Sequence, residues 1–109
     1  MTLRSYHNTY LRANPNRSVD LAPHAKEWER WTLIHLGSNV YNIRSYHGTY
    51  LRGNLNRRVD LAPHAKEWER WTLVNNRHWR SYHGTYLRAN PDRRVDLAPH
   101  AKEWEIWKW

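Results

Sequence analysis

Polar and apolar residues alternate with a period of two in several short stretches of this chain. The pattern is present in "TYLRAN" (9–14), in "EWERWTL" (27–33) and in "RVDLA" (94–98). In the second of these stretches it places Trp31 and Leu33 on one face together with Glu29. Successive side chains of a β-strand point to opposite faces, so this alternation predicts short strands that are buried on one side.

The alternating stretches belong to a unit of 28 residues that occurs three times, at 4–31, 44–71 and 80–107. Twenty-two of its 28 positions are identical in all three copies. Two spacers follow the first and second copies, and "MTL" at the start and "KW" at the end resemble the halves of a third. If the ends meet, the copies close around a threefold axis, whereas an open solenoid would need distinct caps.

Turn-forming residues separate the strands within each copy. His-Gly at 47–48 and 83–84 suits a tight hairpin, and Asn8 stands in place of the glycine because asparagine also tolerates a positive φ. The next turn has proline at its second position in two copies, where the fixed φ of proline is favourable. The segment "APHAKE" (22–27) interrupts the pattern, and we expect one helical turn there before the fourth strand.

Each copy with its spacer therefore predicts about four short strands. The predicted fold class is all-β, a β-trefoil of about twelve strands with pseudo-threefold symmetry. We expect a single domain over 1–109, with repeats at 4–43, 44–79 and 80–109 closed by 1–3. Closure removes exposed strand edges, which would otherwise invite aggregation. A three-bladed or domain-swapped assembly is the alternative.

The run "SYHGTYLRAN…RVDLAPHAKEWERWTL" resembles the repeat of fascin-like β-trefoils, including hisactophilin-type and plant actin-cross-linking relatives. Repeats of that family commonly carry a His-Gly-x-Tyr-Leu hairpin, a third strand with valine and a fourth strand with Trp-Glu-x-aromatic. The resemblance covers all three copies and implies a β-trefoil with an actin- or cytoskeleton-binding surface. Fascin contains four trefoils and this chain one, so actin bundling here implies a dimer or two contact faces.

Charge points to the residues that would make such a contact. The chain carries a net charge of +8, with 14 arginines and four lysines. Guanidinium groups match carboxylates and phosphates, and a positive field favours an acidic partner. We therefore predict that actin or another acidic protein surface contacts the arginines of the second strand and the following turn: Arg12, Arg52, Arg88, Arg17, Arg57, Arg58, Arg93 and Arg94. No nucleic-acid-binding motif accompanies the charge, so nucleic acid is not expected as a partner.

The tryptophans give an alternative function. Trp31, Trp71 and Trp107 are predicted to lie in the core, whereas the first tryptophan of each "EWE" is out of phase with them and is expected to be partly exposed. An exposed indole can stack on a pyranose while neighbouring Asp and His bind the hydroxyls. This alternative is a trefoil lectin that binds glycans in three equivalent pockets, formed by Asp20, His24, Trp28, Asp60, His64, Trp68, Asp96, His100 and Trp104. A third hypothesis is a recently triplicated or designed symmetric scaffold with no specific ligand.

Other chemistry finds little support in the sequence. Cysteine is absent, and no nucleophile, phosphate-loop or metalloprotease motif occurs, so we expect no enzymatic activity, catalytic residue, cofactor or metal. The hairpin histidines His7, His47 and His83 are expected to hydrogen-bond the local backbone, and a pH-sensitive surface is a further option. No apolar run approaches the length of a membrane span. We expect a soluble, cytoplasmic monomer or weak dimer.

Overall fold

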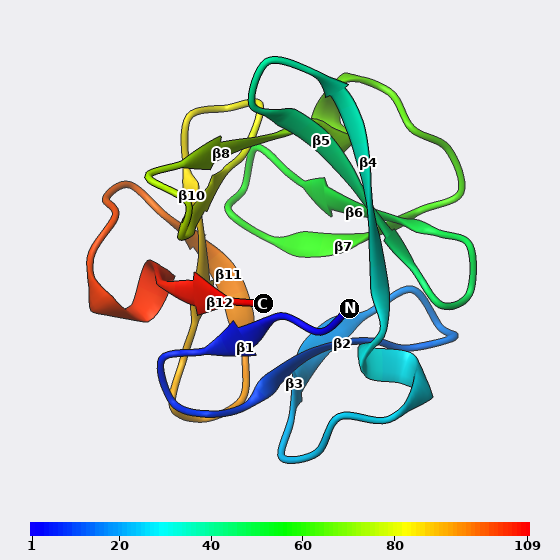
Figure 1. The fold of residues 1–109 in the computed structure, drawn as a ribbon, viewed down its shortest axis with the longest axis vertical. Helices are drawn as coiled ribbons and strands as arrows, with labels where there is room; N and C mark the ends of the chain where they lie inside the picture. The colour runs from blue at the N-terminus through cyan, green and yellow to red at the C-terminus, as the bar shows by residue number, and fades with distance from the viewer.

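The computed structural model describes residues 1–109 and consists of twelve β-strands and three single-turn 3-10 helices (Figure 1). The strands are β1 (Arg4–Ser5), β2 (Tyr10–Ala13), β3 (Val19–Ala22), β4 (Trp31–Gly37), β5 (Val40–Ser45), β6 (Tyr50–Gly53), β7 (Val59–Ala62), β8 (Trp71–Val74), β9 (His78–Arg80), β10 (Tyr86–Ala89), β11 (Val95–Ala98) and β12 (Trp107–Lys108). The 3-10 helices are η1 (Glu27–Glu29), η2 (Glu67–Glu69) and η3 (Glu103–Glu105). The order of four strands with one 3-10 turn recurs three times, which confirms the all-β trefoil. No helix has the length and apolar character that crossing a membrane requires.

The two ends of the chain meet in the sheet. β1 pairs antiparallel with β12, so that Arg4 lies opposite Lys108 and Ser5 opposite Trp107. The backbone N–H of Trp31 also donates to the carbonyl of Met1 at 2.8 Å. In the middle of the chain β5 pairs with both β4 and β8, and β8 pairs with β9. The terminal segments therefore occupy the place of a third spacer, and both ends lie near the centre of Figure 1.

The second and third strands of each repeat form a hairpin, and the three hairpins interlock around the axis. The turns of these hairpins lie at 14–18, 54–58 and 90–94. Each turn accepts a hydrogen bond from the third strand of the next repeat: Leu61 N–H to Arg17 C=O at 3.0 Å, Leu97 to Arg57 at 3.0 Å and Leu21 to Arg93 at 3.1 Å. The turns thus form a closed ring, because the third turn bonds back to the first repeat.

Tryptophan and leucine fill the centre of the molecule. Trp31, Trp71 and Trp107 are at most 2% exposed, which confirms their predicted place in the core. Each indole N–H donates to the carbonyl of a second-strand leucine, as Trp71 does to Leu51 at 2.9 Å. A buried indole with a partner for its N–H contributes a large apolar area without leaving a polar group unsatisfied.

The helical turn lies at Glu27–Glu29, directly after the segment 22–27 in which we expected it. Glu29 is 1% exposed although it is charged, and its carboxylate accepts a hydrogen bond of 2.6 Å from the backbone N–H of Lys26. Glu69 and Glu105 make the same bond in the other repeats. The alternation that places Glu29 on the face of Trp31 thus indicates that Glu29 is buried. Its carboxylate closes the 3-10 turn.

Replacing Trp71 by Ala should lower the free energy of unfolding by about 3–5 kcal/mol, because it leaves a cavity and removes an anchored indole. Urea unfolding followed by circular dichroism measures the change. The matched control is Trp68→Ala, since that indole is 36% exposed and should cost much less. A loss below about 1 kcal/mol for Trp71→Ala would contradict its place in the core.

Candidate functional site

A pocket lies beside the 3-10 helix in the first and third repeats, and we call it the rim pocket. In the first repeat it has a volume of about 370 Å³ and is lined by Arg12, His24, Lys26, Glu27, Trp28 and Glu29. The equivalent residues of the third repeat enclose about 400 Å³: Arg88, His100, Lys102, Glu103, Trp104 and Glu105. The second repeat carries the same side chains at the same positions: Arg52, His64, Lys66, Glu67, Trp68 and Glu69.

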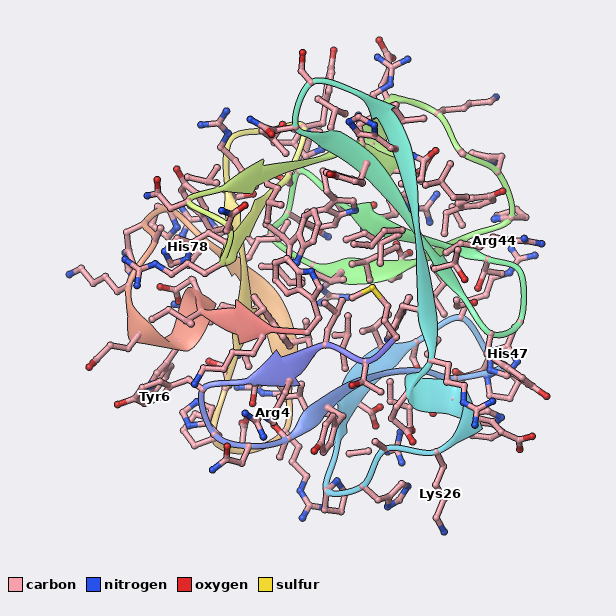
Figure 2. All side chains as sticks on the ribbon, in the orientation of Figure 1. Arg4, Tyr6, Lys26, Arg44, His47 and His78 are labelled. Atoms are coloured by element: carbon pink, nitrogen blue, oxygen red, sulfur yellow. The ribbon has the colours of Figure 1, made fainter.

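A partly exposed tryptophan forms one wall of each rim pocket. Trp28 and Trp104 are 40% exposed and Trp68 is 36% exposed, as their phase relative to the core tryptophans predicted. Each indole contacts the hairpin histidine of the following repeat edge to face, with 5.5 Å between the ring centroids of Trp28 and His47. In Figure 2 His47 lies on the turn between β5 and β6 of the second repeat, next to η1 of the first repeat. The tryptophan is thus held in place while part of its surface stays open.

The hairpin histidines join neighbouring repeats and do not bond the local backbone as expected. Nε2 of His47 lies 3.0 Å from the carbonyl oxygen of Ala13, which belongs to the preceding repeat. His83 and His7 make the same contact with Gly53 and Ala89, at 3.0 and 3.1 Å. Because a carbonyl oxygen only accepts, Nε2 of each histidine is the protonated nitrogen. The pattern within one repeat gives no sign of this partner, since it lies 30 or more residues away in the sequence.

Tyrosines next to these histidines reach the pocket of the preceding repeat, and the sequence analysis missed them. The hydroxyl of Tyr46 donates to a carboxylate oxygen of Glu27 at 3.5 Å, and Tyr82 does the same to Glu67. Tyr6, Tyr46 and Tyr82 are 51–53% exposed. The sign of these tyrosines in the sequence is their position in "SYH", which is identical in all three repeats. One repeat lines each rim pocket, and the next repeat contacts two of its residues, Trp28 through His47 and Glu27 through Tyr46.

The second-strand arginines are held by aspartates of the third strand. Nε and Nη2 of Arg12 donate to the two oxygens of Asp20 at 2.8 and 2.7 Å, and Asn14 donates to the same carboxylate at 3.0 Å. Arg52–Asp60 and Arg88–Asp96 repeat this geometry. The guanidinium groups predicted to contact an acidic partner at Arg12, Arg52 and Arg88 are thus already bound within the chain.

The carboxylate of this pair has a shifted pKa. Partial burial acts to raise the pKa of Asp20, but the hydrogen bonds from Arg12 and Asn14 outweigh it, and the pKa falls below its ordinary value of 3.8. Asp60 and Asp96 shift in the same direction for the same reasons. A carboxylate that is ionised and fully engaged by its own chain has little capacity left for a ligand.

The structure divides the residues predicted for a sugar site. His24 and Trp28 line the same rim pocket, and Nε2 of His24 lies 3.8 Å from the buried carboxylate of Glu29. Asp20 does not line this pocket. It lies on the other side of Arg12, in an open depression of about 670 Å³ with Asn14 and the following turn. Glu29 supplies a fixed carboxylate in the pocket where the sequence analysis had expected the aspartate.

The turns that carry exposed arginines are each bonded to the next repeat around the axis, and we call these five residues the arginine ring: Arg17, Arg57, Arg58, Arg93 and Arg94. All five side chains belong to exposed residues, and only Arg94 makes an ion pair, with Asp92 at 2.9 Å. Interlocking of the hairpins, which no single repeat reveals, brings these charges together.

No group of three or more His, Cys, Asp or Glu side chains lies close enough together to hold a metal ion. Comparison of the chain with protein-family models and with curated proteins finds no match. The resemblance to fascin-like proteins therefore remains a prediction about family and function, while the fold itself is established.

Stability should depend on the Arg–Asp pairs at acid pH. Because folding lowers the pKa of Asp20, Asp60 and Asp96, their contribution is present above their ordinary value of 3.8 and is lost as pH falls through the lower folded values. The triple variant D20N/D60N/D96N should be less stable than the wild type at pH 7, and the difference should shrink below about pH 4.

Thermal unfolding between pH 2 and pH 7 measures this dependence. Asp92→Asn is the control, because Asp92 is exposed and pairs only with the neighbouring Arg94. A stability difference that stays constant across this pH range would contradict the role given to the three pairs.

Proposed function

We propose that this protein is a non-enzymatic carbohydrate-binding module with three equivalent rim pockets. The observation that carries the proposal is a partly exposed tryptophan, held by a histidine of the next repeat, in a pocket with fixed charged groups. The same arrangement of residues recurs around the axis.

The side chains of the rim pocket suit a sugar ring. An indole face stacks on the apolar face of a pyranose, and the polar groups around it can exchange hydrogen bonds with hydroxyls. Glu27, which is exposed, contributes acceptors, and Lys26 and Arg12 contribute donors. The pair with Asp20 fixes the Arg12 guanidinium, and the backbone bond from Lys26 to Glu29 fixes the turn that carries Trp28, so these parts of the pocket need little ordering on binding.

Threefold repetition fits this function. A single small pocket with one aromatic wall binds a sugar weakly, but three pockets on one rigid molecule can engage a branched or clustered glycan together. The second and third contacts then form at a high effective concentration, which raises the overall affinity without new contacts.

Actin or another acidic protein surface remains the prediction from the family resemblance, with the arginines as contacts. Four of the eight predicted arginines are paired with aspartates, and no contact in the fold favours actin over other acidic partners. A symmetric scaffold without a ligand would leave the partial exposure of all three tryptophans without a role. These considerations place the glycan hypothesis first.

A glycan array tests the proposal directly. We expect the wild type to bind a defined set of glycans, and the triple variant W28A/W68A/W104A to lose at least tenfold in affinity for them, because stacking is removed from every pocket. Trp109→Ala is the matched control, since this indole is 47% exposed and lies outside the rim pockets.

Two outcomes would count against the proposal. A blank array would remove its basis, and so would a triple variant that folds, by its thermal unfolding curve, and still binds as the wild type does.

A further inference from the structure

We propose that the ligand is an anionic polysaccharide, which places a pyranose in a rim pocket and its acidic groups on the arginine ring. This inference rests on the proposed function and adds the chemical class of the glycan. It follows from the strained backbone of the ring, from its unpaired charge and from its contact with the pocket.

The backbone of each turn would favour a residue other than arginine. Arg17, Arg57 and Arg93 have φ values of 72°, 67° and 72°, in the left-handed region that glycine and asparagine adopt most readily. The bonds that hold the turn use only backbone groups of these residues, such as Arg17 N–H to Asn14 C=O at 3.1 Å. No hydrogen bond or ion pair within the fold uses the side chains of Arg17, Arg57 and Arg93, so their guanidinium groups are open to a partner.

The charge of the ring is not neutralised within the chain. The nearest acidic residues of the third strands, Asp20, Asp60 and Asp96, are bound by Arg12, Arg52 and Arg88. Arg17, Arg57, Arg58 and Arg93 have no ion pair, and the turns that carry them bond directly to neighbouring strands. The three turns surround one axis, so their charges add to a single positive field that favours an anionic partner and weakens as salt rises.

The rim pocket has a different charge balance. Its lining contains two cationic residues, Lys26 and Arg12, and two acidic residues, Glu27 and Glu29, together with His24. Such a balanced lining suits a sugar ring with hydroxyls better than an isolated anion. The two surfaces thus favour different parts of one ligand, a pyranose at the pocket and an acidic group at the ring.

The pocket and the ring adjoin each other. Arg12 lines the rim pocket and binds Asp20, and Asp20 accepts a hydrogen bond from Asn14, the first residue of the turn that carries Arg17. A polysaccharide that leaves the pocket across Arg12 therefore arrives at the turn. Guanidinium groups bind sulfate and carboxylate oxygens through paired N–H donors, and both groups occur on acidic polysaccharides.

The experiment compares polyanions that differ in their acidic groups and in their backbone; desulfated heparin keeps its uronate carboxylates and lacks only the sulfates. Heparin, fully desulfated heparin, polygalacturonate and poly-glutamate are titrated against the intact chain at two salt concentrations. We expect tighter binding of heparin or polygalacturonate than of desulfated heparin, with an affinity that falls as salt rises. The better of the two acidic polysaccharides identifies sulfate or carboxylate as the favoured group.

The test variant is R17G/R57G/R93G. Glycine adopts the positive φ of these positions without strain, so the variant keeps its fold. We expect it to bind the favoured acidic polysaccharide at least tenfold more weakly, with a shallower salt dependence, while the affinity for neutral glycans of the array stays unchanged. R17N/R57N/R93N should behave in the same way.

The matched control is R4Q/R44Q/R80Q, which removes three equivalent exposed arginines elsewhere on the molecule; Arg4 and Arg44 are labelled in Figure 2. If this control loses as much affinity as the glycine variant, net charge alone explains the binding and the inference is wrong. Equal affinity of the wild type for heparin and desulfated heparin, with no gain for polygalacturonate, would overturn it as well.

The remaining outcomes separate the inference from the proposed function. If poly-glutamate competes as well as heparin, and W28A/W68A/W104A binds heparin as the wild type does, the partner is an acidic protein and the inference fails. If the array shows neutral glycans bound through the tryptophans while the arginine variants change nothing, the proposed function stands and the inference fails alone. If no glycan of the array binds and only the arginine substitutions weaken heparin binding, both the proposed function and the inference fail. The arginine ring is then an anion site that acts without the rim pocket.

Discussion

Hydrogen bonds between neighbouring repeats are the constraint on which the rest of the molecule depends. The N–H of Leu61 in the second repeat bonds to Arg17 in the first, and His47 bonds to Ala13 across the same boundary. A single repeat has a short hairpin and a few apolar side chains, which is too little to satisfy its backbone or bury its tryptophan. Three copies with a closing β1–β12 pair leave no repeat without a neighbour.

The same bonds create both candidate surfaces. The wall of the rim pocket is held in place by the next repeat, because the turn between β5 and β6 packs His47 against Trp28 and brings Tyr46 to Glu27. The arginine ring exists because each turn is bonded to the following repeat and the third turn closes the circle. Both surfaces thus depend on contacts across the boundaries between repeats, which one copy alone could not make.

Electrostatics separate the arginines into two groups that look alike in the sequence. Arg12 and its equivalents lie opposite aspartates in the hairpin register, so their charge stabilises the fold and lowers the pKa of the carboxylate. Arg17 and its equivalents lie in turns where only backbone groups bond, so their charge is left for solvent or a partner. Strand register, which places residue 12 opposite residue 20, decides between these roles.

The sequence by itself determined the fold class, the three repeats, the strand pattern and the buried tryptophans, because alternation and turn residues act over a few neighbouring positions. It also indicated that Trp28 is partly exposed, since that residue is out of phase with Trp31. Only the tertiary structure decided that Asp20 is engaged by Arg12, that His47 bonds to Ala13 and that the arginine turns meet. These contacts depend on how whole hairpins pack across repeats, and the alternation within one repeat carries no information about that packing.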